Sequence, residues 1–120
     1  MLSLLVVEDH DEMRAALREW LAKSLPPHIL REARSMDEAL ESAGREKPDL
    51  VLMNLELPGA NGLEATRELR RRDPDCPVVI MSLNDAEVLR AAAADAGALA
   101  FVPKHALPGA LLSILQRAAR

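Results

Sequence analysis

The sequence predicts an α/β fold with a parallel β-sheet, because short apolar runs alternate with stretches of helical period along its 120 residues. Hydrophobic residues make up 49% of the chain and charged residues 28%, which is ordinary for a globular protein. This length suits one domain with a sizeable core. The apolar run at residues 50–53 is unbroken by polar residues, which suits a strand covered on both faces.

The first half of the chain is predicted to contain two strands, each followed by a helix. Residues 4–7 form the first apolar run, and a more polar strand is expected at 29–33. The helix between them should end before the prolines at 26–27. Ser35 and Glu38 form a capping-box pattern at the start of the second helix. The apolar stripes of the two helices consist of Met13, Ala16, Leu17, Trp20 and Leu21, and of Met36, Ala39, Leu40 and Ala43.

The second half is predicted to contain three strands, each followed by a helix. Apolar runs indicate strands at 50–53, 78–81 and 99–102. Helices are expected at 62–72 and at 85–96, the second of them with a glycine C-cap. The apolar face of the last helix is formed by Leu107, Leu111, Ile114, Leu115 and Ala118.

Five repeated strand–helix units with right-handed crossovers give a doubly wound sheet with helices on both faces. They fit the flavodoxin-like (βα)5 arrangement, whose strand order is 2-1-3-4-5. In this arrangement a ligand crevice lies at the carboxyl ends of the first and third strands. Side chains that follow these strands are therefore the first candidates for a functional site.

Polar and charged residues stand at the ends of four of the apolar runs: Glu8 and Asp9, Asn54, Ser82, and Lys104. Paired carboxylates suit Mg²⁺, which takes one or two carboxylates together with water and substrate oxygens. A hydroxyl and a lysine nearby suit a phosphate group. The set predicts a Mg²⁺-dependent phosphoryl-acceptor site, although the amide at position 54 is no phosphoryl nucleophile.

These residues resemble the receiver domain of two-component response regulators, over about residues 4–117. Pro58 and Gly62 follow position 54 at the family's offsets of four and eight. The resemblance implies an acidic metal-binding pair at Glu8 and Asp9, a phospho-acceptor position at Asn54, a switch hydroxyl at Ser82, a switch aromatic at Phe101 and a phosphate-binding lysine at Lys104. It also implies Asn54 and the backbone carbonyl of Glu56 as further Mg²⁺ ligands, with the Glu56 side chain lining the entrance.

The family's acceptor is an aspartate, so Asn54 is the departure that matters most. An aspartate attacks through anionic oxygens while Mg²⁺ offsets the charge of the incoming phosphate. Asn54 offers a neutral carbonyl and an NH₂ group, so Mg²⁺ binding is expected to be weakened and a stable acyl phosphate is not available. A natural pseudo-receiver and a deliberate Asp→Asn change both remain open as its origin. Without metal, three carboxylates would crowd the crevice, so Asn54→Asp is predicted to cost ~1 kcal/mol of stability.

Simpler structural roles stand beside these functional ones. Ser82 also fits a strand terminator, Lys104 a surface lysine, and Phe101 a core aromatic. The functional interpretation instead aims Ser82 at a phosphate, pairs Lys104 with Asp9 in the resting state, and lets Phe101 turn inward as a packing switch. The three histidines, including His10 near the crevice, are scattered and do not indicate a metal site.

The first functional hypothesis is a signalling receiver domain that serves a sensor histidine kinase and, with Asn54, rests in an inactive-like state. A homodimer would use the helix at 85–96, the strand at 99–102 and the last helix, or else the first and last helices. The second hypothesis is a natural pseudo-receiver that acts as a phosphorylation-independent interaction module. An enzyme is not expected, because a haloacid-type phosphatase would need an Asp nucleophile where Asn54 stands. No glycine-rich phosphate loop follows the first strand, which argues against a nucleotide or flavin site.

The predicted domain organisation is one receiver domain over residues 1–120. Residues 57–67 look most like the NarL/FixJ/LuxR-type subgroup, which carries a C-terminal helix-turn-helix output domain and regulates transcription. No output domain is present in these 120 residues, and the abrupt stop favours a piece of a longer protein over a stand-alone receiver.

Charge and composition exclude several other classes. The net charge of −4, without a basic block, argues against direct nucleic-acid binding by this domain. No apolar stretch approaches a membrane span and no secretory leader precedes the first strand, so a cytoplasmic location is expected. The single cysteine, Cys76, excludes an internal disulfide and is expected to be a packing residue.

Overall fold

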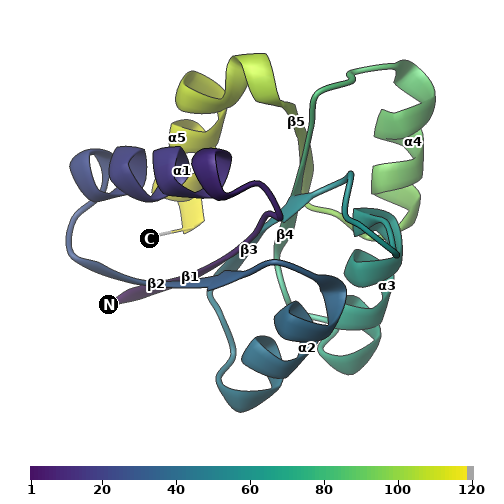
Figure 1. Cartoon of the computed structure of the whole chain (residues 1–120), viewed down its shortest axis with the longest axis horizontal. Helices are drawn as coiled ribbons and strands as arrows, with labels where there is room; N and C mark the ends of the chain where they lie inside the picture. Colours follow the sequence, from purple (N-terminus) through teal and green to yellow (C-terminus); the bar gives the residue numbers. More distant parts are fainter. Residues whose placement is uncertain (119–120) are drawn as a thin grey trace.

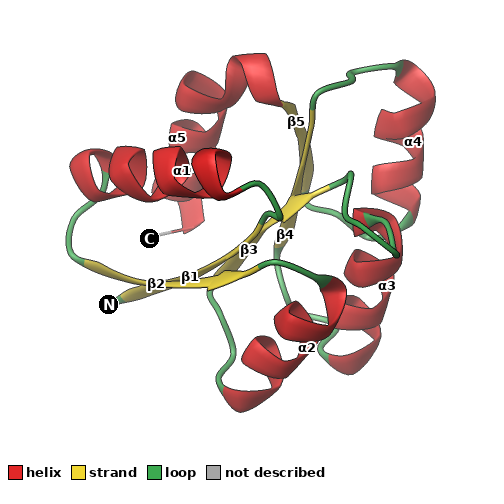
Figure 2. Cartoon of the chain, in the orientation of Figure 1, coloured by secondary structure: helices red, strands yellow, loops and turns green. Residues whose placement is uncertain are grey.

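The computed structural model describes residues 1–118, along which strands and helices alternate (Figures 1 and 2). The strands are β1 (Leu2–Val7), β2 (His28–Ala33), β3 (Leu50–Asn54), β4 (Val78–Ser82) and β5 (Ala100–Pro103). The helices are α1 (Asp11–Ser24), α2 (Met36–Arg45), α3 (Gly62–Arg72), α4 (Glu87–Asp95), the short 3-10 helix η1 (Lys104–Ala106) and α5 (Leu107–Ala118).

The five strands form one parallel sheet in the order β2-β1-β3-β4-β5, which confirms the predicted topology. Val7 at the end of β1 lies opposite Met53 in β3. Asn54 lies opposite Met81, and Ser82 lies opposite Pro103. The carboxyl ends of β1, β3, β4 and β5 therefore meet along one edge of the sheet.

Helices cover both faces of the sheet, with α1 and α5 on one side and α2, α3 and α4 on the other (Figure 1). Successive strand residues point to opposite faces. Leu4 and Val6 accordingly pack with α1 and α5, whereas Leu5 and Val7 pack with the other three helices. The strands β3 and β4 are buried along their whole length, as the unbroken apolar run at 50–53 predicted.

Local capping fixes where several helices begin and end. Ser35 caps α2 by accepting a hydrogen bond from the Glu38 N–H, as the capping-box pattern predicted. Asn61 caps α3 in the same way. After α4 the chain turns at Gly97, whose φ of +94° lies in the left-handed region. The predicted glycine thus stands one residue beyond the C-cap Ala96.

The fourth helix is shorter than predicted, because α4 begins at Glu87 rather than at residue 85. The side chain of Asn84 accepts a hydrogen bond from the Ala86 N–H at 2.9 Å, which forms a turn ahead of the helix. No helix among residues 1–118 has both the length and the apolar character that crossing a bilayer requires. Cys76 is a buried packing residue as predicted, and burial raises the pKa of its thiol.

Candidate functional site

The residues singled out by the sequence do meet at the carboxyl edge of the sheet. Glu8 and Asp9 follow β1, Asn54 ends β3, and Ser82 ends β4. Lys104 begins the η1 turn directly after β5. Direct hydrogen bonds join Asn54 and Lys104 to Glu8, so residues from the first, third and fifth units share one site.

The amide nitrogen of Asn54 lies among three oxygens. Its Nδ2 donates to Glu8 Oε2 at 2.9 Å, to Asp9 Oδ1 at 3.1 Å and to the backbone carbonyl of Glu56 at 2.8 Å. All three partners are acceptors, so turning the amide over would set its own oxygen against three other oxygens. The chemistry of the neighbours thus fixes the orientation of the amide. Its Oδ1 is buried and has no hydrogen-bond partner among the described residues.

Glu8 carries a buried charge that Lys104 balances. The Glu8 side chain is 0% exposed and the Lys104 side chain 9%, and Lys104 Nζ lies 2.8 Å from Glu8 Oε1. The expected pairing of Lys104 with Asp9 is therefore wrong. Asp9 is 26% exposed and keeps contact with solvent, whereas the fully buried Glu8 needs the counter-charge more.

The Glu56 side chain does more than line the entrance of the site. Its Oε2 accepts a hydrogen bond from Ser82 Oγ at 2.9 Å, and its Oε1 accepts one from the Leu83 N–H at 3.2 Å. Ser82 Oγ in turn accepts from the Asn84 N–H at 3.1 Å. The hydroxyl predicted to meet a phosphate is thus already bonded to a carboxylate.

Phe101 is half-buried and packs against the core on the α4 side of the sheet. The guanidinium of Arg90, on α4, lies 5.1 Å from the centre of its ring. This distance is within the range of a cation–π contact. The side chain is both a core aromatic and a point of contact with α4, which leaves both sequence-based interpretations of Phe101 open.

One residue near the site was expected to have no role there, and another was not predicted at all. His10 Nδ1 lies 3.6 Å from Glu8 Oε2 and 4.0 Å from Asp9 Oδ2, so a histidine lies against the acidic pair after all. Arg14 is buried and donates from Nη1 to the backbone carbonyl of Glu8 at 3.0 Å. A hydrogen bond from Arg14 also lowers the pKa of Asp11 at the start of α1. The spacing of Asp11 and Arg14 along one helix face was the available signal.

Gly62 lets α3 start against the end of β3. A Cβ at this position would lie 2.4 Å from the backbone oxygen of Asn54 and 2.9 Å from the Cα of Leu55. Gly62 N–H donates to the Leu55 carbonyl at 2.7 Å, and Thr66 Oγ1 donates to the Gly62 carbonyl at 2.7 Å. The glycine therefore serves close approach, and it holds the loop that carries Glu56.

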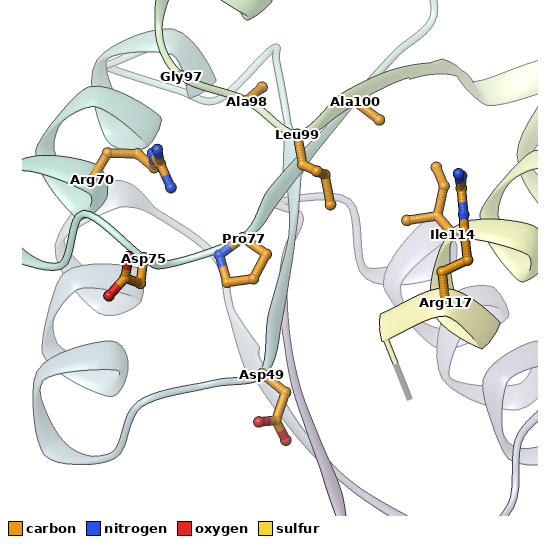
Figure 3. Close-up of a pocket in the computed structure, with 10 residues that line it drawn as sticks. All are labelled: Asp49, Arg70, Asp75, Pro77, Gly97, Ala98, Leu99, Ala100, Ile114 and Arg117. Atoms are coloured by element: carbon orange, nitrogen blue, oxygen red, sulfur yellow. The ribbon is translucent and has the colours of Figure 1, made fainter. Parts of the chain in front are cut away.

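A cavity lies at the opposite end of the strands, where their amino ends meet (Figure 3). Its volume is about 740 Å³, and Asp49, Pro77 and Leu99 reach it from segments that precede β3, β4 and β5. Arg70 and Arg117 line it from the ends of α3 and α5. None of the lining residues belongs to the site at the carboxyl edge.

The chain belongs to the response regulator receiver domain family, whose model matches residues 4–116. It is 40% identical over 116 residues to the transcriptional activator protein ExaE of Pseudomonas putida, covering 97% of this chain and 54% of that protein. It is 30% identical over 116 residues to the response regulator UvrY of Escherichia coli, covering 97% of this chain and 53% of that protein. The chain thus spans about half the length of these curated relatives.

Solved structures agree with this assignment. The crystal structure of a two-component response regulator of the LuxR family from Aurantimonas sp. SI85-9A1 superimposes with a TM-score of 0.90 at 30% identity. That match covers 99% of this chain and 86% of the other. The chain is therefore a two-component receiver domain related to transcriptional response regulators, which is a signalling domain rather than an enzyme.

Receiver domains typically bind Mg²⁺, and the oxygens around Asn54 are of the kind that this ion takes. In the amide orientation seen here, Asn54 offers the ion no oxygen of its own. The hydrogen-bearing Nδ2 of Asn54 points into the space between the Glu8, Asp9 and Glu56 oxygens, and a cation there would meet N–H groups instead of a fourth oxygen. The protein itself supplies both partners of the Glu8 carboxylate, a neutral N–H donor from Asn54 and the ammonium of Lys104.

Proposed function

We propose that this chain is the receiver domain of a transcriptional response regulator whose position 54 cannot accept a phosphoryl group, so that the domain rests in its unphosphorylated state. The observation that carries this proposal is the Asn54 amide, whose Nδ2 donates to Glu8, Asp9 and the Glu56 carbonyl. A phosphoryl acceptor must present an anionic oxygen, and here the group that faces the acidic pair is an N–H donor.

The partners of this function follow from the family. A two-component receiver implies a cognate sensor histidine kinase. In our proposal that kinase docks on the domain without transferring a phosphoryl group to position 54. An attached helix-turn-helix output domain, a cytoplasmic location, and a homodimer through α4, β5 and α5 or through α1 and α5 belong to the same proposal.

We also propose that Mg²⁺ binds this chain more weakly than it binds the Asn54→Asp variant. The aspartate would add an anionic oxygen to those of Glu8, Asp9 and the Glu56 carbonyl, as a hard cation requires. The roles of Ser82 and Lys104 as phosphate partners, and of Phe101 as a packing switch, would then be latent in this chain.

A second candidate function is a phosphorylation-independent interaction module whose state a partner protein sets. Its support is that the side-chain donors of the site already have protein partners, since Asn54 Nδ2, Ser82 Oγ and Lys104 Nζ all donate to oxygens of the chain. Such a site has no need of a metal or a phosphoryl group to satisfy its donors.

Titration with Mg²⁺ and beryllofluoride separates the two candidates, with this chain and the Asn54→Asp variant measured side by side. Trp20 fluorescence is a suitable probe, because Trp20 is half-buried and packs against the core beneath α1 and α5. A response by the aspartate variant alone supports a receiver that one side chain disables. A response by neither supports the interaction module, and an equal response by both contradicts the proposal.

A further inference from the structure

A carboxylate from the β3–α3 loop occupies the hydrogen-bond donors at the carboxyl end of β4. The two oxygens of Glu56 accept from Ser82 Oγ at 2.9 Å and from the Leu83 N–H at 3.2 Å. One planar anion thus spans the hydroxyl of one residue and the backbone of the next. A hydroxyl and a neighbouring backbone N–H are donors suited to an oxyanion, whether it is a carboxylate or a phosphate.

The same residue also contacts Asn54 through its backbone. The Glu56 carbonyl accepts from Asn54 Nδ2 at 2.8 Å, while its side chain reaches Ser82, which lies 26 positions further along the chain. Glu56 therefore links the end of β3 to the end of β4. The donors at the end of β4 would otherwise face a site that contains a neutral amide in place of an anion.

We propose that Glu56 is a positioning residue that takes the place of an external oxyanion at Ser82 and Leu83 and thereby fixes the segment between β4 and α4. This inference rests on the proposed function, because it assigns Glu56 a role at a site where Asn54 carries no phosphoryl group. The state of the β4–α4 segment is then set within the chain itself, by a residue two positions after Asn54.

The segment that Glu56 holds presents apolar side chains to solvent. Leu83 is 75% exposed and Val88, in the first turn of α4, is 72% exposed. The backbone between them is held by Asn84, whose N–H donates to Ser82 Oγ and whose Oδ1 accepts from the Ala86 N–H. Without the Glu56 carboxylate, Ser82 Oγ would lose its acceptor. The hydrogen bonds that follow at Asn84 would then start from a hydroxyl that is no longer held in place.

Amide hydrogen exchange, followed by NMR on the whole chain without metal or phosphate donor, tests the proposal. Glu56→Ala should speed exchange at Leu83 and Asn84 about three- to tenfold, the range that corresponds to losing one net hydrogen bond. Glu56→Gln keeps the shape and removes the charge, so it should give a smaller increase. The matched control is Glu64→Gln on α3. The backbone N–H of Glu64 donates to Asn61, but its carboxylate makes no hydrogen bond within the described residues.

Amides in the middle of β3, such as that of Leu52, serve as the internal reference for global stability. Faster exchange at Leu83 with unchanged exchange at Leu52 supports a local anchor. Equal exchange at Leu83 in the unmutated chain and in Glu56→Ala would overturn the proposal, as would a uniform increase at both amides. Because no kinase, metal or acyl phosphate is involved, the result does not depend on whether position 54 proves phosphorylatable.

Discussion

At the scale of single residues, the polarity of one side-chain group decides what the site can do. Asn54 and aspartate have nearly the same shape, but Asn54 presents two N–H groups where aspartate presents a second anionic oxygen. In this chain those N–H groups face Glu8 Oε2, Asp9 Oδ1 and a backbone carbonyl. Replacing this NH₂ group by an anionic oxygen therefore makes the contacts with these oxygens repulsive instead of attractive.

Asn54→Asp should consequently destabilise the chain when no divalent cation is present. The variant loses the donors to Glu8 and Asp9 and adds a third carboxylate beside them, at an expected cost of about 1–3 kcal/mol. Urea unfolding in EDTA measures this change, and added Mg²⁺ should restore much of it. Asn61→Asp is the matched control, because the Asn61 side chain accepts from the Glu64 N–H and aspartate caps helices equally well. An Asn54→Asp variant more stable than the Asn54 chain in EDTA would contradict this account.

The location of the site residues could be predicted from the sequence, but their partners could not. Glu8, Asn54 and Ser82 stand at the ends of apolar runs, and parallel strands bring such ends together. Whether Lys104 pairs with Glu8 or Asp9 depends on which carboxylate is buried, and a run of apolar residues does not encode that. The reach of the Glu56 side chain to Ser82 depends likewise on the loop geometry.

At the scale of the elements, the packing of α3 against β3 determines how the loop between them is held. The helix starts at Gly62, directly beside the backbone of Asn54. The observed bounds of α3 agree with the predicted 62–72, whereas the start of α4 was predicted two residues too early. An Asx turn at Asn84 competes with helix formation there, and the apolar periodicity of the helix gives no sign of it.

Gly62→Ala is expected to destabilise the fold by about 1–3 kcal/mol, because the new Cβ would meet backbone atoms of Asn54 and Leu55 that cannot move freely. Gly44→Ala, within α2, is the control, because nothing lies within 4 Å of its added Cβ. That change should stabilise the chain by about 0.5–1 kcal/mol through higher helix propensity. Thermal unfolding of both variants provides the comparison, and equal effects of the same sign would be inconsistent with the close approach at Gly62.

An ion-pair cluster on α3 predicts a pH dependence. Hydrogen bonds from Arg71 and Arg72 lower the pKa of Glu68 from 4.5 to about 2. A lowered folded-state pKa means that the stabilisation is fully present above pH 4.5 and is lost as the pH falls toward about 2. The unmutated chain should therefore exceed Glu68→Gln in stability at neutral pH, and the difference should vanish as the pH approaches about 2. Urea unfolding of both proteins at several pH values tests this prediction, and a stability difference independent of pH would refute it. High salt should reduce the difference, because the two arginines of the cluster are exposed.

At the scale of the whole molecule, the site ties the first strand unit to the last. Glu8 follows β1 and Lys104 follows β5, and their ion pair joins residues 96 positions apart in the sequence. The strand order places β3 and β4 between them, so the contact closes across the carboxyl edge of the sheet. The strength of the ion pair between Glu8 and Lys104 therefore affects the cooperativity of folding as well as the geometry of the site.

Lys104→Met should therefore cost about 3 kcal/mol, because it leaves the fully buried Glu8 carboxylate without its counter-charge. Glu8→Gln should be costly for the converse reason, since it leaves the Lys104 ammonium almost buried and unpaired. The double variant removes both charges together, so its cost should be smaller than the sum of the two single costs by about 1–3 kcal/mol. Unfolding free energies from urea titrations of the four proteins complete the cycle. Strictly additive costs would mean that the two charges do not stabilise one another, and the ends of β1 and β5 would then be held together by the apolar sheet alone.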